Sequence, residues 1–233
     1  MADAGRRAQL AANLDEVRGR IARACRAAGR EPESVTLIAI TKTYPASDVE
    51  LLASLGVTDI GENKDQEASA KAAAVQASVR WHFVGQLQRN KVRSVVRYAD
   101  VVQSVDSVRL ASALARAAEA HRSAPLEVLV QVSLDGDASR GGVAEPDIWD
   151  VVETVAWSPA LRLGGLMAVA PMDWPPDRAF SDLSVLSERL RAVHPTATVI
   201  SAGMSGDLEE AIKHGATHVR IGTSLLGMRK TLR

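Results

Sequence analysis

The chain has 233 residues, of which 46% are hydrophobic and 24% are charged, and its 28 basic side chains balance its 28 acidic ones. This composition is typical of a soluble globular protein, and the length suits one α/β barrel domain. A net charge of zero gives no electrostatic reason to bind nucleic acid, and no stretch approaches the roughly 18 apolar residues that a membrane span needs. We therefore expect neither nucleic acid nor a membrane as a partner.

The chain contains a single cysteine, Cys25, so no intramolecular disulfide can form. Structural disulfides are typical of oxidising compartments. Residues 1–10 include Asp3, Arg6 and Arg7 and lack the apolar segment of a signal peptide. We expect a cytoplasmic protein in which Cys25 is a small buried residue.

The predicted elements begin with an amphipathic helix over residues 6–29, where apolar side chains recur at spacings of three and four. Beyond it, short β-branched runs alternate with alanine-rich helical segments at about 46–55, 62–77, 87–98, 107–121, 145–157, 177–193 and 206–214. The runs are Val35–Thr41, Val57–Ile60, Arg80–Val84, Asp100–Val105, Leu126–Ser133, Leu161–Ala168, Thr196–Ser201 and Thr217–Ile221.

Eight nearly continuous apolar runs separated by helices are typical of parallel strands that are buried on both faces. Eight strands fit a closed barrel better than an open sheet. We therefore predict a single (β/α)8 TIM-type barrel domain over residues 1–233, with an extra N-terminal helix. A doubly wound open sheet is the alternative.

A lysine stands at the end of the first predicted strand. Lys42 directly follows the run Val35–Thr41, and Pro45 breaks the chain soon after. At the C-terminal end of a buried strand an ammonium group is partly desolvated, which increases the neutral amine available for Schiff-base chemistry. The alternative is that the Lys42 side chain reaches from the strand end to solvent.

Two loops of small residues follow the last two predicted strands. Ser201–Asp207 opens a helix, with Ser205 as its expected N-cap, and Arg220–Ser224 follows the eighth strand. Barrels frequently bind phosphate at these two positions through backbone N–H groups. The alternative is that the glycines only make tight turns. In a closed barrel these loops lie beside the first strand, so Lys42 would face a bound phosphate ligand.

Arg220, at the end of the eighth predicted strand, has two interpretations. It pairs with a carboxylate as a structural element, or it donates to the ring nitrogen of a pyridine cofactor. A guanidinium only donates, so in the second case it keeps that nitrogen unprotonated and weakens carbanion stabilisation. The lysine, the two small-residue loops and the arginine together favour pyridoxal 5′-phosphate (PLP) as a cofactor.

Seven segments, spread in order over about residues 35 to 227, are similar to those of the YggS/PROSC family, the pyridoxal phosphate homeostasis proteins. They are Thr41-Lys42-Thr43, Gly61-Glu62-Asn63, Trp81-His82-Phe83-Val84-Gly85, Leu87-Gln88-Arg89-Asn90-Lys91, Gly165-Leu166-Met167, Gly203-Met204-Ser205-Gly206-Asp207-Leu208 and Val219-Arg220-Ile221-Gly222-Thr223.

This resemblance implies a barrel like the N-terminal domain of bacterial alanine racemase, with Lys42 as the Schiff-base lysine. It implies that Arg220 approaches the pyridine nitrogen and that Asn63 and His82 line the pocket. From the residues alone, Asn63 suits the cap of the helix that begins near residue 62, a role compatible with lining the pocket. His82 is then better explained as a core histidine with one hydrogen bond. The resemblance places the phosphate at Ser201, Met204, Ser205, Gly222 and Thr223.

Other candidate sites are weaker. His214 and His218 lie four apart but straddle Gly215, and no cysteine or acidic residue joins them at ligand spacing, so we expect no metal site. The basic residues of segment 89–97 fit a solvated helix face better than an anion-binding patch.

The expected function is binding of PLP on Lys42 for its buffering or delivery inside the cell, without substantial catalysis. Racemases of the related barrel type need a second acid/base, a tyrosine from an additional C-terminal domain. The chain ends at Arg233, and its tyrosines, Tyr44 and Tyr98, are not in that position. We therefore expect two-base racemisation to be slow or absent.

We expect a monomer whose partners are PLP, other B6 vitamers and apo forms of PLP enzymes. The alternative function is a low-activity PLP-dependent racemase or related enzyme, in which water or Tyr44 acts as the second base. A barrel that binds a phosphorylated metabolite without an aldehyde ranks below both.

Overall fold

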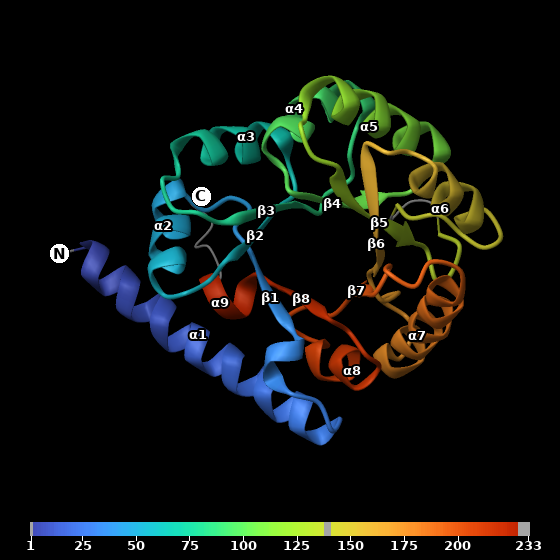
Figure 1. The fold of residues 1–233 in the computed structure, drawn as a ribbon. Helices are drawn as coiled ribbons and strands as arrows, with labels where there is room; N and C mark the ends of the chain where they lie inside the picture. Colours follow the sequence, from blue (N-terminus) through green and yellow to red (C-terminus); the bar gives the residue numbers. More distant parts are fainter. Residues whose placement is uncertain (1, 138–140, 228–233) are drawn as a thin grey trace.

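The computed structural model describes residues 2–137 and 141–227. Eight parallel strands close into a barrel in sequence order, and helices surround it (Figure 1). The strands are β1 (Thr36–Ile40), β2 (Asp59–Glu62), β3 (Arg80–Phe83), β4 (Val101–Val105), β5 (Leu126–Val132), β6 (Leu161–Ala168), β7 (Val199–Ser201) and β8 (His218–Ile221). The predicted (β/α)8 fold is therefore confirmed.

The helices agree with the predicted segments except at their ends and at two short helical segments, residues 32–34 and 223–226, which the sequence does not predict. Three or four residues are too few to show a helical period. The helical segments are α1 (Ala2–Ala27), η1 (Pro32–Ser34), α2 (Ala46–Ser54), α3 (Asp65–Ala74), η2 (Arg89–Lys91), α4 (Val92–Tyr98), α5 (Val108–His121), α6 (Ile148–Ala156), α7 (Pro176–Val193), α8 (Leu208–Lys213) and α9 (Thr223–Leu226).

The extra N-terminal helix lies along the outside of the barrel, across α2, α9 and α8 (Figure 1). One face of α1 is buried, and it carries Leu10, Leu14, Val17, Ile21 and Cys25. These side chains share one apolar cluster with side chains of β1, β8, α8 and α9. The helix thereby covers the seam where the first and last strands pair. Cys25 is buried, as predicted.

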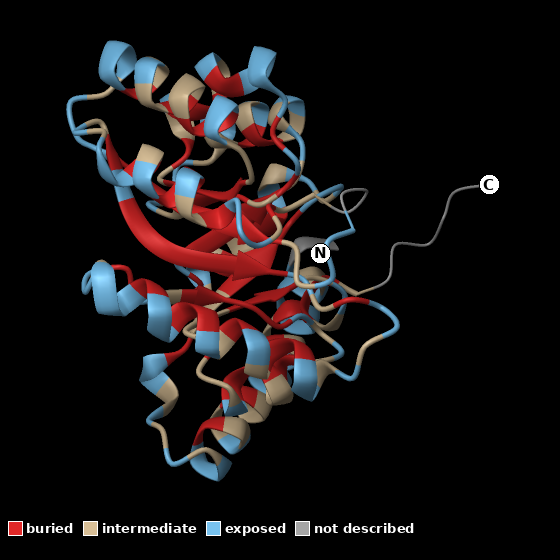
Figure 2. Cartoon of the chain, turned by 90° about the vertical axis from the view of Figure 1, so that its right-hand side faces the viewer, coloured by how far each residue is buried: buried red, intermediate tan, exposed pale blue. Residues whose placement is uncertain are grey.

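The strands are buried on both faces, as Figure 2 shows, where the central sheet is almost wholly buried. Apolar side chains of the strands pack outward against the helices in two large clusters. The barrel interior is more polar, because hydrogen-bonding side chains point into it. Among them are His82, Gln103, Ser201 and Arg220. Among the described residues, no helix is long and apolar enough to cross a bilayer.

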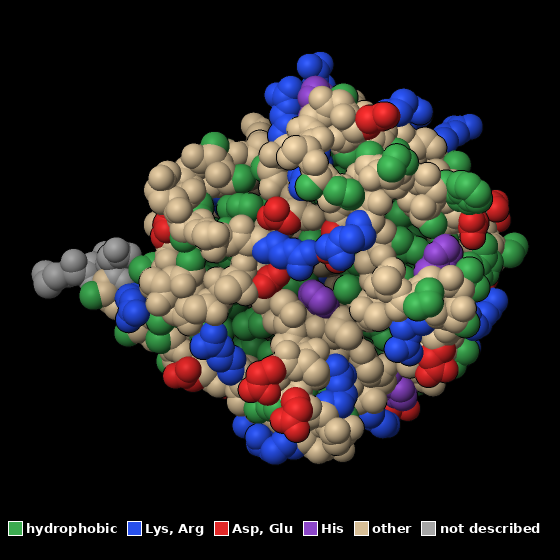
Figure 3. Space-filling view, in the orientation of Figure 1, with side chains coloured by type: hydrophobic (Ala, Val, Ile, Leu, Met, Phe, Trp, Pro, Cys, Tyr) green, Lys and Arg blue, Asp and Glu red, His purple; other side chains and the backbone are tan. Residues whose placement is uncertain are grey.

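Charged side chains close the end of the barrel at which the strands begin. Glu127 of β5 forms ion pairs with Arg80 of β3 and Arg162 of β6. Basic, acidic and histidine side chains gather over the centre of this end (Figure 3). Because these groups pair with one another, the other end of the barrel, where the strands finish, is the one left to form a site.

His218, the first residue of β8, predicts a pH dependence of stability. Burial lowers the pKa of His218 from 6.5 to about 4. Between pH 7 and pH 5 the unfolded chain therefore takes up a proton at this position and the folded chain does not. Stability falls as pH falls through this window, by about 2 kcal/mol for this group.

The substitution His218→Gln isolates that effect, because glutamine is polar and does not titrate, while Asp59, Arg80, His82 and Arg220 nearby stay in place. Urea unfolding at pH 7 and pH 5 should show a loss of stability that is about 2 kcal/mol smaller in the variant than in the wild type. Equal losses in the two proteins would contradict this assignment.

Candidate functional site

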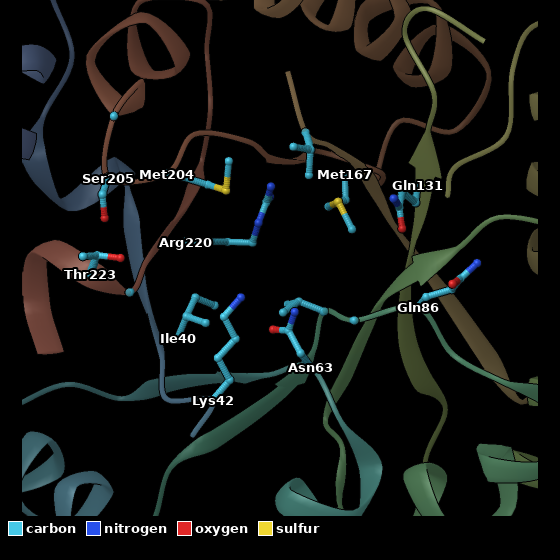
Figure 4. A pocket seen from close by; sticks show the side chains of 15 residues that line it. Ile40, Lys42, Asn63, Gln86, Gln131, Met167, Met204, Ser205, Arg220 and Thr223 are labelled. Carbon is cyan, nitrogen blue, oxygen red and sulfur yellow. The ribbon is translucent and has the colours of Figure 1, made fainter. Parts of the chain in front are cut away.

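A cavity of about 420 Å³ opens at the end of the barrel where the strands finish. Residues from nearly every strand end contribute to it, and Lys42 and Arg220 both point into it (Figure 4). Its lining consists of Ile40, Lys42, Asn63, Val84, Gly85, Gln86, Gln131, Met167, Val169, Met204, Ser205, Gly206, Arg220, Gly222 and Thr223. Seven of the nine predicted site residues are in this lining.

Lys42 reaches the cavity because β1 ends at Ile40 and Thr41 is the last buried residue of that run. The carbonyl of Thr41 accepts a hydrogen bond from the ammonium of Lys71 at 2.7 Å, and the Thr41 hydroxyl donates to Glu62. These contacts fix the backbone directly before Lys42. The expected partial desolvation of Lys42 is not found, because its side chain lies beyond the buried strand and is exposed.

The Lys71–Glu62 ion pair beneath this loop is buried, with Nζ and Oε1 2.6 Å apart. Burial raises the pKa of Glu62, although hydrogen bonds from Lys71 and Thr41 oppose the shift. The second carboxylate oxygen, Oε2, has no hydrogen-bond partner among the described residues. The pair therefore stabilises the site as long as both partners are present.

Asn63 enters the cavity from the end of β2, beside the loop that follows β3. A Cβ atom on Gly85 would lie 2.0 Å from the carbonyl oxygen of Asn63, so only glycine allows the two loops to approach this closely. Asn63 does not cap a helix: α3 begins at Asp65, and its N-cap residue is Lys64. Of the two sequence interpretations of Asn63, the structure therefore agrees with the pocket-lining one.

The small-residue loops after β7 and β8 lie side by side at one end of the cavity. The backbone N–H of Ser224 donates to the Ser205 hydroxyl at 3.3 Å, which joins the two loops. The prediction that Ser205 is the N-cap of α8 is wrong. That position belongs to Asp207, whose carboxylate accepts from the backbone N–H of Met204.

Arg20 of α1 supports these loops from behind. Its guanidinium donates to the carbonyl oxygen of Ser205 at 2.9 Å and makes two bonds of 2.7 Å to Glu209. Hydrogen bonding to Glu209 raises the pKa of Arg20, and the same contact lowers the pKa of Glu209. No sequence pattern predicts this role, since Arg20 looks like an ordinary surface residue of an amphipathic helix.

Arg220 projects from β8 into the middle of the cavity. Its guanidinium donates to Ser201 Oγ and to the carbonyl oxygen of Ala168, both at 2.8 Å. It forms no ion pair with a carboxylate among the described residues, so the structural-pair interpretation does not hold there. Burial lowers the pKa of Arg220 to about 10, which leaves it charged at neutral pH.

His82 and Ser201 do not line the cavity. Both point into the barrel interior, where His82 is 1% exposed and Ser201 is fully buried. His82 Nδ1 contacts Gln103 Nε2 at 2.9 Å, and the Ser201 hydroxyl donates to Gln103 Oε1 at 2.7 Å. The resemblance to a family motif identifies such residues but does not distinguish a lining position from a supporting one.

Tyr44 does not line the cavity either. Its hydroxyl donates to the carbonyl oxygen of Gly227 at 2.6 Å, and its ring belongs to a neighbouring surface depression with Pro45 and Glu67. The alternative in which Tyr44 acts as a second base within the site therefore has no geometric support.

Residues 12–230 match the family model of the alanine racemase N-terminal domain. The chain is 47% identical over 244 residues to the pyridoxal phosphate homeostasis protein of Mycobacterium tuberculosis, covering 97% of this chain and 95% of that protein. It is 37% identical to the protein of the same name from Escherichia coli K12, covering 94% and 97%. The chain belongs to the family of pyridoxal phosphate homeostasis proteins.

Solved structures agree with this membership. PipY of Synechococcus elongatus PCC7942, whose structure contains bound PLP, is 32% identical to this chain, with a TM-score of 0.82, 94% of this chain covered and 100% of PipY. An alanine racemase of Clostridium difficile 630 is 14% identical, with a TM-score of 0.76 over 96% of this chain and 58% of that one. The racemase comparison supports the shared fold alone.

Proposed function

We propose that this family member binds PLP, holds it as a Schiff base on Lys42 and serves the homeostasis of the cofactor without substantial catalysis of its own. The observation that carries the proposal is the common cavity, where an exposed amine, a guanidinium and two adjoining small-residue loops face the same space. Within the described part of the chain, that guanidinium has no carboxylate partner. The name of the relatives and the PLP in PipY support the same cofactor.

The donor set fits the chemistry of PLP. A phosphate group accepts hydrogen bonds, and Ser205, Gly222 and Thr223 offer hydroxyl and backbone donors at one end of the cavity. An aldehyde requires a reachable primary amine, which Lys42 supplies. A pyridine nitrogen accepts a hydrogen bond, and Arg220 has N–H groups beside the cavity that bond to none of the described residues.

The residues of the chain do not favour strong catalysis. Bound PLP supplies an electron sink for bonds at an amino-acid α-carbon. Arg220 would donate to the ring nitrogen rather than protonate it, because a charged guanidinium gives up its proton far less readily than a carboxylic acid. A weaker electron sink at bound PLP suits a protein that holds and releases the cofactor better than one that catalyses a reaction with it.

Exchange of the cofactor with the surroundings follows from the exposure of Lys42. An exposed amine is open to solvent and to competing amines. We propose that apo forms of PLP enzymes and other B6 vitamers are partners. We also propose that the chain acts as a monomer in the cytoplasm. The apolar side chains of Val169 and Met204 line the cavity and are exposed, and contact with another protein would bury them.

The proposal is tested by binding of PLP and of pyridoxal, which lacks the phosphate. The wild type should bind PLP at least about tenfold more tightly than pyridoxal, since a phosphate gains charge-assisted bonds. Thr223→Val keeps the side-chain shape and removes the hydroxyl, so it should weaken PLP but leave pyridoxal unchanged. Absence of PLP binding by the wild type would refute the proposed function.

A further inference from the structure

A continuous chain of buried hydrogen bonds runs through the barrel interior behind the cavity. It starts at Arg220, passes through Ser201 and Gln103 to His82, and ends at Asp59. The four links are 2.8, 2.7, 2.9 and 2.8 Å long, and strands β8, β7, β4, β3 and β2 supply one residue each. It spans the barrel from the open end to the closed one.

The two ends of the chain fix the direction of every bond. A guanidinium only donates, so the Ser201 oxygen accepts from Arg220 and its single proton goes to Gln103 Oε1. The Gln103 amide nitrogen then donates to His82 Nδ1. An ionised carboxylate only accepts, so His82 carries its proton on Nε2 and donates it to Asp59. All four bonds therefore point from Arg220 to Asp59.

Asp59 is ionised, as this direction requires. Burial alone would raise the pKa of Asp59, but hydrogen bonds from His82 and Thr58 outweigh burial and lower it. The nearby His218 is neutral at pH 7, and its ring centre lies 6.3 Å from that of His82. Arg80 also lowers the pKa of Asp59, and at this end of the barrel Arg80 and Arg162 both pair with Glu127.

The arrangement explains how a buried arginine is held without a direct counter-ion. A carboxylate bonded to Arg220 would occupy its N–H groups and neutralise its charge beside the cavity. Neutral Ser201, Gln103 and His82 instead orient the guanidinium, and aligned hydrogen bonds polarise one another. Only two of its five N–H groups are bonded among the described residues, to Ser201 and Ala168, so others are left for a ligand.

We propose that Ser201, Gln103, His82 and Asp59 are positioning residues that orient Arg220 so that it donates a hydrogen bond to the ring nitrogen of the bound pyridine cofactor. The inference rests on the proposed function, and it assigns His82 and Ser201 a role behind the ligand rather than in contact with it. It also assigns roles to Gln103 and Asp59, which no motif indicated.

The test compares PLP with its 1-deaza analogue, in which C–H replaces the ring nitrogen and removes the acceptor. The wild type should bind PLP about tenfold more tightly than the analogue, the loss expected for one buried hydrogen bond. Ser201→Ala, and Gln103→Leu as a second break in the chain, should weaken PLP about tenfold and the analogue less than about twofold. Both ligands are measured by equilibrium titration.

Ser104→Ala is the matched control. Ser104 is the neighbour of Gln103 on β4, its hydroxyl is equally buried, and that hydroxyl has no hydrogen-bond partner among the described residues. Its removal should change neither affinity. Because the control lies on the same strand, it reports any general effect of deleting a buried hydroxyl from β4.

The outcomes distinguish a failure of the positioning role from a failure of the proposed function. Equal weakening of PLP and the analogue in Ser201→Ala and Gln103→Leu, or no weakening of either, would overturn the positioning role. Equal binding of both ligands by the wild type would also overturn it, while the proposed function would stand. A wild type that binds neither ligand refutes the proposed function and this inference with it.

Discussion

Replacing Lys42 by alanine should weaken PLP binding about 100-fold, equivalent to about 2.7 kcal/mol. The reason is that Lys42 is the amine that lines the cavity, so the variant loses the proposed covalent bond and keeps only the contacts to the ring and the phosphate. Lys42→Arg should not restore binding, because a guanidinium retains the charge but cannot form a Schiff base under these conditions. Fluorescence or absorbance titration with PLP measures both.

The control for this prediction is Lys91→Ala, which removes an exposed lysine outside the cavity and should leave the affinity unchanged. The fold should also be unaffected by Lys42→Ala, because an exposed side chain contributes little to stability. An affinity for PLP in Lys42→Ala that equals the wild-type value would remove Lys42 from the proposed site.

Replacing Lys71 by methionine should destabilise the protein by about 3–5 kcal/mol. The substitution leaves Glu62, which is 1% exposed, without its cationic partner, and an unpaired buried carboxylate is strongly unfavourable. It also removes the hydrogen bond to the Thr41 carbonyl directly before Lys42. Urea unfolding at pH 7 measures the change in free energy.

Lys64→Met is the matched control, because Lys64 precedes α3, is exposed and forms no ion pair among the described residues. Its effect should stay within about 0.5 kcal/mol. The double variant Glu62→Gln/Lys71→Met should recover part of the lost stability, since neither charge is then buried alone. A cost of Lys71→Met no larger than that of Lys64→Met would show that the pair does not stabilise the fold.

The barrel could be predicted from sequence because its strands are buried on both faces and therefore appear as eight nearly continuous apolar runs. Strand ends were less certain. The run Val57–Ile60 forms a strand only from Asp59, and Thr196–Ser201 only from Val199, because the preceding residues belong to the turns that enter the strands.

The cavity residues could be predicted where a strand end and a motif coincide, as at Lys42 and Arg220. The exposure and the hydrogen-bond partners of these two side chains could not be predicted. The exposure of Lys42 depends on where β1 stops, and the neutral partners of Arg220 come from strands distant in sequence. Gln103 carried one usable signal: a glutamine within the apolar run Asp100–Val105 must find a polar partner when buried.

The contact that Arg20 makes could not be predicted from the periodicity of its helix. A helix periodicity separates a buried face from an exposed one, but it does not reveal which exposed side chains reach a loop of the barrel. The bond from Arg20 to the Ser205 carbonyl joins residues 185 positions apart, and only the packing of α1 against α8 brings them together.

Borohydride reduction followed by peptide mass analysis tests the central claim most directly. The purified protein is incubated with PLP, reduced and digested. We predict a visible absorption band that reduction abolishes and a pyridoxyl phosphate mass on the peptide that contains Lys42, with no such mass on that peptide in Lys42→Ala. A protein that shows no band and carries no modified peptide after incubation with PLP, or one modified only at other lysines, would contradict the account.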